Sequence, residues 1–219
     1  MLLNESVWIK KTLSEHFSEN DFPLLNIGSS TKEFREIVQP HIDQNVFTPL
    51  RQRGLKLIHT DIKLDSGVDV AGDINEANFQ DKLKALGVKS VLCSNLLEHL
   101  SDPHQICKSM LELVERGRLL LITVPYSFPY HKDPIDTLFR PNIEQLHHLF
   151  QGTEIVTAQI VEETWTYKMS LVANKKYLMI MLVRWLLPFY KYSEWRYMIS
   201  DLFNWNKKHA STCILLRKL

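Results

Sequence analysis

Four side chains that could move protons or bind anions fall within ten residues, at His131, Asp133, Asp136 and Arg140. A histidine that titrates near neutrality can act as a general base, and Asp136 could orient it. Arg140 could hold an anionic group of a substrate. We therefore name His131 and Asp136 as candidate catalytic residues. In the alternative interpretation, Asp136 pairs with Arg140 and His131 packs on Tyr130, which would make this segment purely structural.

A second group of polar residues could bind a ligand, because each of them follows a short apolar run. The group consists of Gly28-Ser29-Ser30, Asp61, Asp73 and Asn95. If the apolar runs are parallel strands, these residues all lie at the carboxyl edge of one sheet, where ligands bind in open α/β folds. Taken singly, each could equally be a turn residue or a solvated strand end. Their joint placement predicts a binding site at that edge.

The elements that must position these residues alternate between strands and helices. Apolar runs predict strands at 24–27, 55–60, 68–71, 88–93, 118–124, 155–161 and 212–216, and helical spacing predicts helices at 6–18, 34–39, 75–86, 101–116 and 142–150. Ser6 and Ser101 are predicted helix caps, Pro40 is predicted to end a helix, and 43–53 is predicted to be a polar loop. This alternation predicts a mainly parallel sheet that is covered by helices on both faces.

The order of these motifs resembles the class I S-adenosylmethionine-dependent methyltransferases. It most resembles a type 11-like bacterial group with a Glu-His-Leu segment, here Glu98-His99-Leu100, and a His-x-Asp-Pro-x-Asp loop, here 131–136. The resemblance covers about residues 20–160 and the final strand. It implies one α/β domain over 1–219, a Rossmann-like sandwich whose seven-stranded, mainly parallel sheet has an antiparallel last strand, with a helical insertion before that strand.

The resemblance also implies how S-adenosylmethionine would bind. Ser29 and Ser30 would donate to its carboxylate, Asp61 would accept from the ribose hydroxyls, and Asp73 would accept from the adenine amino group. Ile74 would pack on the adenine ring and Asn95 would lie beside the reactive methyl group. The implied cofactor residues are Asn26, Ile27, Gly28, Ser29, Ser30, Asp61, Ile62, Asp73, Ile74 and Asn95.

The first loop departs from the family pattern, which is typically Asp/Glu-x-Gly-x-Gly-x-Gly. This chain has the neutral Asn26 and a single glycine, Gly28. Ser30 replaces a glycine whose dihedral angles are difficult for serine to adopt. The loop therefore favours weakened cofactor binding.

The composition is ordinary for a globular protein. The net charge of +1 gives no nucleic-acid signature, and no spacing typical of a metal site is present. Cys93, Cys107 and Cys213 read as small buried hydrophobic residues. No signal peptide or spanning apolar run is evident, so the expected location is cytoplasmic.

Residues 165–208 differ in composition from the rest of the chain. They contain four of the five tryptophans, and eight basic residues against two acidic ones. Residues 177–190 are apolar except for Arg184 and Pro188. This mixture suits a membrane interface at the inner face of the membrane, or contact with a lipid carrier. A hydrophobic lid and a homodimer face are the alternatives.

Three functions compete. The leading hypothesis is a methyltransferase that acts on a small molecule or a glycoconjugate, including a lipid-linked one. A catalytically weak or inactive scaffold that binds a partner or membrane through 165–208 is the second. A nicotinamide dehydrogenase is disfavoured, because G-x-G-x-x-G is missing after the first strand.

Overall fold

In the described part of the chain, seven strands form one sheet in the order β3-β2-β1-β4-β5-β7-β6. The computed structural model describes residues 1–129, 135–173, 175–192, 195–196 and 206–219. The strands are β1 (Leu24–Ile27), β2 (Leu57–Asp61), β3 (Val70–Ala71), β4 (Ser90–Ser94), β5 (Leu119–Ser127), β6 (Thr153–Thr166) and β7 (Lys208–Lys218).

The strand directions follow from the pairing. Strands β1 to β5 pair in parallel, whereas β7 is antiparallel both to β5 and to β6. The predicted mainly parallel sheet with an antiparallel last strand is confirmed. Because β7 is antiparallel to both of its neighbours, β6 runs parallel to β5. The carboxyl end of β6 therefore lies at the same edge of the sheet as the carboxyl end of β5.

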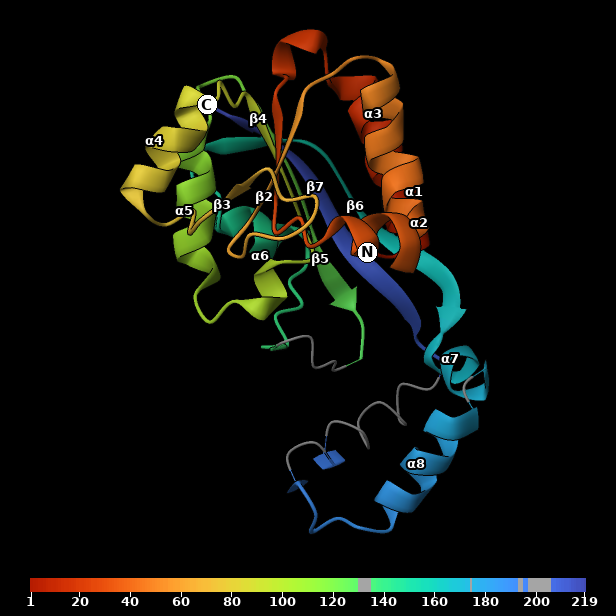
Figure 1. Ribbon diagram of the computed structural model, residues 1–219. Helices are drawn as coiled ribbons and strands as arrows, with labels where there is room; N and C mark the ends of the chain where they lie inside the picture. The colour runs from red at the N-terminus through yellow and green to blue at the C-terminus, as the bar shows by residue number, and fades with distance from the viewer. Residues whose placement is uncertain (130–134, 174, 193–194, 197–205) are drawn as a thin grey trace.

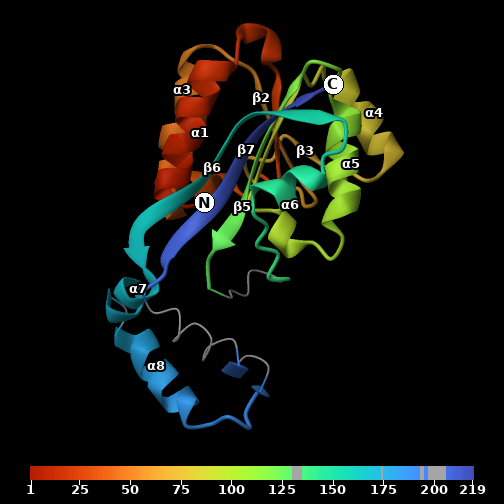
Figure 2. The same ribbon diagram turned by 180° about the vertical axis from the view of Figure 1, so that it is seen from behind.

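Helices cover both faces of the sheet (Figures 1 and 2). On one face lie α1 (Leu3–His16), α2 (Pro40–Ile42) and α3 (Thr48–Gln52), together with the π-helical turns Phe34–Val38 and Asp43–Phe47. On the other face lie α4 (Ala77–Ala85), α5 (Pro103–Leu113) and α6 (Ile143–His148). The short 3-10 turns are Glu19–Asp21 and Leu97–His99.

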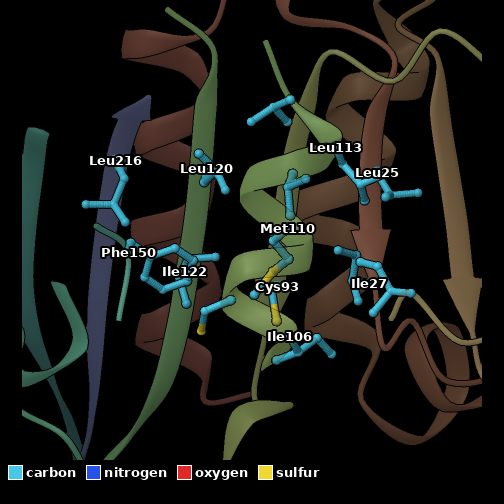
Figure 3. Close-up of a cluster of buried hydrophobic side chains, with 14 of the residues drawn as sticks. Leu25, Ile27, Cys93, Ile106, Met110, Leu113, Leu120, Ile122, Phe150 and Leu216 are labelled. Carbon is cyan, nitrogen blue, oxygen red and sulfur yellow. The ribbon is translucent and has the colours of Figure 1, made fainter. Parts of the chain in front are cut away.

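The alternation of side chains along each strand divides the core into two layers. Ile27, Cys93 and Ile122 point toward Met110 and its neighbours on α5 (Figure 3). Residues one position earlier or later in the same strands, such as Leu92, pack against α1 and the helices beside it. All three cysteines are buried free thiols, as predicted, and burial raises the pKa of Cys107 to about 12.

Three local predictions were wrong. Residues 43–53 are largely helical, because Val46, Phe47 and Leu50 are buried against α1. Ser6 is not a cap, because α1 already begins at Leu3 and the Ser6 hydroxyl donates to the carbonyl of Leu3. Pro40 follows the end of the preceding helical turn at Val38, as predicted, and also starts α2, since a proline at the first helical position needs no N–H partner. The cap of α5 is Asp102, not Ser101: the Asp102 carboxylate accepts from the backbone N–H groups of His104 and Gln105.

Residues 167–173 and 175–192 project beyond the sheet as an arm (Figure 1). The arm begins where β6 ends and contains α7 (Tyr167–Ala173) and α8 (Lys175–Trp185). Among the described residues, no helix has the length and apolar character needed to cross a bilayer.

The cap of α5 provides a test of this local structure. Asp102→Ala should lower the free energy of unfolding by about 1 kcal/mol, because two N–H groups at the start of the helix lose their acceptor. Ser101→Ala, one residue earlier and equally exposed, is the matched control and should change stability by less than about 0.5 kcal/mol. Urea unfolding of both variants measures the difference. An equal loss in the two variants would contradict the assignment of the cap.

Candidate functional site

Four strand ends meet at the carboxyl edge of the sheet. Ile27, the last residue of β1, is in register with Thr60 of β2 on one side and Cys93 of β4 on the other. Asp61 is in register with Ala71, the last residue of β3. The residues that follow these strands are therefore neighbours, as the sequence predicted, and this edge is the candidate site.

The loop after β1 turns through two residues with left-handed backbone conformation. Gly28 has a φ of 67° and Ser30 a φ of 54°. Glycine is needed for this conformation, whereas a Cβ at this position would meet only the end of the Leu96 side chain, 3.0 Å away at Cδ1. Ser30 occupies the conformation that the sequence indicated to be difficult for serine, at a cost of about 1 kcal/mol.

Hydrogen bonds within the protein hold this loop. The N–H of Ser29 donates to the carbonyl of Thr60 at 3.0 Å, and the N–H of Ser30 donates to the Asp61 carboxylate at 2.9 Å. The guanidinium of Arg35 donates to the carbonyls of Ser29 and Ser30 at 2.8 and 2.7 Å, and also to that of Gly67. Ser30 is thus held in its left-handed conformation by a hydrogen bond at its N–H group and another at its carbonyl.

These bonds change the role that the sequence assigned to the loop. Both N–H groups expected to donate to a ligand carboxylate already donate to Thr60 and Asp61. The hydroxyl of Ser29 donates to the carbonyl of Ser30 at 3.2 Å. Sequence reasoning also missed Arg35, which is buried and lies six residues after Ser29. Its only signal was a cation placed early in the helical segment that follows the loop.

Asn26 and Ile27 lie below the loop, in the sheet itself. The amide of Asn26 is 3.0 Å from Nδ1 of the buried His59, on the neighbouring strand. Burial lowers the pKa of His59 to about 4, so this pair is neutral near pH 7. Ile27 is buried in the core. An acidic residue at position 26 would face an apolar layer that includes Phe47, whose ring packs on His59, which explains the neutral side chain.

The two aspartates at the ends of β2 and β3 are only partly buried. Asp61 accepts from Ser30, and Asp73 accepts from the N–H of Asn75 at 2.9 Å. Each carboxylate has further acceptor capacity, because a carboxylate can accept about four hydrogen bonds. The isoleucines beside them differ: Ile62 is 69% exposed, whereas Ile74 is 5% exposed and packs in the core.

Asn95 is directed toward a carboxylate that the sequence did not bring to notice. It has a φ of 51° immediately after β4, and its amide donates to Glu5 at 2.8 Å. Glu5 is 0% exposed. Its other partners are the N–H of Leu2 and the hydroxyls of Ser94, Thr123 and Ser211. The side chain of Asn95 therefore forms part of a polar cluster that joins α1 to three strands.

A second buried carboxylate, Glu98, follows the same strand. It is 1% exposed, and its Oε2 has no hydrogen-bond partner in the described structure. Burial raises the pKa of Glu98 from 4.5 to about 8, with the nearby charge of Glu5 adding to the effect. Its Oε1 lies 3.8 Å from Nε2 of His99, whose other ring nitrogen bonds to the carbonyl of Ile135. Glu98 and His99 thus connect the end of β4 to the loop after β5.

The candidate catalytic residues lie in that loop. His131 is outside the described residues. Asp136 is buried, forms an ion pair with Arg140 at 2.7 Å and accepts from the N–H of Leu138 at 2.8 Å. Arg140 also donates to the carbonyl of Phe128. The pairing of Asp136 with Arg140 is the one that the structural interpretation of this segment expected.

A separate hollow lies at the far margin of the sheet, along β6. It is lined by Asn4, Gln159, Ile160, Val161, Glu162, Glu163, Thr164 and Lys208. The strand ends described above are on other strands, so this hollow is not part of the candidate site. We place the site at the carboxyl edge because the glycine turn and the two partly buried aspartates converge there.

Comparisons with known proteins place the fold. No protein-family model and no curated protein matches the chain. Among solved structures, Haemonchus contortus phosphoethanolamine N-methyltransferase 2 in complex with S-adenosyl-L-methionine aligns at 14% identity with a TM-score of 0.52, over 98% of this chain and 52% of that one. The chain thus spans about half the length of that enzyme.

Two further structures cover more of their own length. A chain of the complex between the Haloferax volcanii Trm112 methyltransferase activator and a methyltransferase aligns at 11% identity and a TM-score of 0.53, over 98% of this chain and 91% of that one. A protein from Galdieria sulphuraria described as a sarcosine dimethylglycine methyltransferase aligns at 12% and 0.52, over 97% and 84%. The chain has the class I methyltransferase fold. Ligands of open α/β sheets bind at the carboxyl edge, so the loop after β1 and the ends of β2 to β4 remain the candidate site.

The polar cluster around Glu5 can be tested by stability. Glu5→Ala should lower the free energy of unfolding by about 3–5 kcal/mol, because buried donors on α1, β4, β5 and β7 lose their acceptor. Glu15→Ala, at a half-exposed position on the same helix, should cost less than about 0.5 kcal/mol. Urea unfolding monitored by circular dichroism compares them. Equal midpoints for Glu5→Ala and the unsubstituted protein would show that the cluster does not hold α1.

The raised pKa of Glu98 predicts a pH-dependent stability. Between pH 4.5 and 8 the folded state keeps the Glu98 proton while the unfolded state releases it, so the free energy of unfolding falls as pH rises, by up to about 1.4 kcal/mol per pH unit. Glu98→Gln removes this proton and should be more stabilising at pH 7.5 than at pH 5.5. Glu112→Gln, on the exposed face of α5, should have the same small effect at both pH values. A Glu98→Gln effect that does not change with pH would contradict the assignment.

Proposed function

We propose that this protein is an S-adenosylmethionine-dependent methyltransferase that acts on a small molecule or a glycoconjugate, including a lipid-linked one. The observation that carries the proposal is the pair of partly buried aspartates, Asp61 and Asp73, beside the Gly28 turn at the carboxyl edge of this fold. The Haemonchus enzyme with the same fold was solved with S-adenosyl-L-methionine. We treat residues 1–219 as one domain that includes the arm, and place it in the cytoplasm.

The residues present fit the nucleoside part of the cofactor better than its methionine part. Asp61 has acceptor capacity for ribose hydroxyls, and Asp73 for an amino group of the base. Gly28 carries no Cβ, although the side chain of Leu96 lies 3.0 Å from the position that a Cβ would take. The amide groups of Ser29 and Ser30 are engaged within the loop, so the methionine carboxylate would depend on the Ser30 hydroxyl and on neighbouring groups.

The cofactor, when bound, supplies an electrophilic methyl group. The protein must then hold an acceptor with an available lone pair in line with that group, and positioning alone can supply much of the rate. Where the acceptor is a hydroxyl or an ammonium, a proton must leave it, and His131 is our candidate base. Asp136 would orient that base. The ion pair with Arg140 and the hydrogen bond from the N–H of Leu138 would hold the Asp136 carboxylate in place.

A non-catalytic scaffold is the second candidate function. It is favoured by the closed loop, since Asp61 and Arg35 bind groups of Ser29 and Ser30 that a ligand would otherwise approach. It is also favoured by the engagement of Asn95 with Glu5. In that case the arm, rather than the strand ends, would be the functional surface.

Cofactor binding separates these two functions. Isothermal titration with S-adenosylmethionine and with S-adenosylhomocysteine should give saturable binding, and Asp61→Asn should weaken it by about 10- to 100-fold, the value of a hydrogen bond to a charged group. Asparagine keeps one oxygen for the N–H of Ser30, so the loop is retained while an acceptor is lost. Asp81→Asn, at an exposed position on α4, should leave binding unchanged.

Two results would count against the enzyme. Absence of heat from either ligand at millimolar concentration, with the protein folded by circular dichroism, would favour the scaffold. Equal binding by Asp61→Asn and the unsubstituted protein would remove the aspartate from the cofactor site.

A further inference from the structure

The arm exposes an unusual amount of apolar surface for a monomer in water. Phe189 is 98% exposed, Leu186 75% and Met179 63%. Others that are about half exposed or more are Val172, Ile180, Leu182, Val183, Trp185, Leu187, Tyr190 and Tyr192. An exposed apolar patch of this extent marks a surface that contacts something other than water.

The apolar residues of α8 do not form a single stripe. At 100° per residue, the exposed positions Met179, Ile180, Leu182, Val183 and Trp185 spread over about 220° of the helix circumference. A flat partner, such as the sheet domain or a second copy, would cover one side of the helix, whereas an apolar phase surrounds it. The distribution therefore favours lipid over a lid or a dimer face.

The length of α8 fits one leaflet of a bilayer. Its 11 residues extend about 16 Å, which is close to half of the roughly 30 Å hydrocarbon core. The helix is therefore too short to cross the hydrocarbon core and would remain in one leaflet.

The polar residues of the arm match the surface of an anionic bilayer. The sequence of the arm has five basic side chains and no acidic one, while the whole chain has a net charge of only +1. Arg184 and Lys191 both lie 5.7 Å from the ring centre of Tyr190. Basic and aromatic side chains beside an apolar helix are typical of the headgroup region, where the cations bind anionic lipids.

We propose that the arm is a monotopic anchor that inserts into a bilayer containing anionic phospholipids. Because β6 runs parallel to β5, the arm leaves the sheet at its carboxyl edge, the edge that also holds the candidate site, but at the opposite margin, next to β6 and β7 (Figures 1 and 2). An inserted arm holds that edge at the headgroups. The acceptor is then a molecule presented at the membrane surface, a statement that rests on the proposed function, whereas the anchor itself does not.

Vesicle flotation of the full chain tests the anchor without cofactor. The protein should float with vesicles of equal parts phosphatidylcholine and phosphatidylglycerol, and less with phosphatidylcholine alone or at high salt. Phe189→Asp should lower the vesicle partition coefficient at least about tenfold, because a charge replaces an inserted ring. Ile37→Asp is the matched control: it replaces a 73%-exposed apolar side chain outside the arm and should float like the unsubstituted protein.

Sedimentation of the same variants in the absence of vesicles identifies the other occupants. A dimer that Phe189→Asp dissociates, together with no flotation, would replace the membrane by a second copy. A monomer that does not float would overturn the anchor in favour of a lid. Since flotation needs no cofactor and the titration described above needs no vesicles, failure of the anchor and failure of the proposed function are separate results.

Discussion

The arrangement of the candidate site depends on the buried carboxylate of Glu5. A carboxylate without water is tolerated only when donors surround it, and here the donors come from the start of α1 and from β4, β5 and β7. These segments are distant in sequence, so the bonds that satisfy the carboxylate also fix α1 against three strands. An apolar contact would not do the same, because it has no direction. Asn95 takes its orientation from this cluster.

Arg35 fixes the loop after β1 by hydrogen bonds, as Glu5 fixes α1 against the strands. The usual glycines would let the loop after β1 turn without strain, but this chain must hold Ser30 in a left-handed conformation. Two peptide carbonyls directed at Arg35, and one N–H directed at Asp61, supply the necessary constraint. The N–H groups of Ser29 and Ser30 are consequently bonded within the protein. The left-handed serine and the buried arginine therefore belong to one structural solution.

The sequence predicted the sheet well, because each strand is a short apolar run and each ends at a glycine, proline or polar residue. It also predicted that Gly28, Asp61, Asp73 and Asn95 share one edge, since this follows from parallel strands alone. What it missed depends on long-range contacts. Residues 43–53 are polar enough for a loop, and become helical because a few of them are buried against α1. The sequence did not single out Glu5 or Arg35, because nothing local reveals which partners enclose them.

The two antiparallel strands at the margin link the arm to the site. They extend past the segments predicted from apolar periodicity, β6 to Thr166 and β7 from Lys208, because an edge pair can continue with polar residues facing water. Both extensions project from the carboxyl edge, and Ser127 at the end of β5 lies next to Ala210. Rigid strands thus carry the apolar arm away from the edge where the aspartates lie. A membrane that fixes the orientation of the arm would also fix the orientation of the candidate site. The reason is that paired strands, unlike a flexible linker, connect the arm to the sheet.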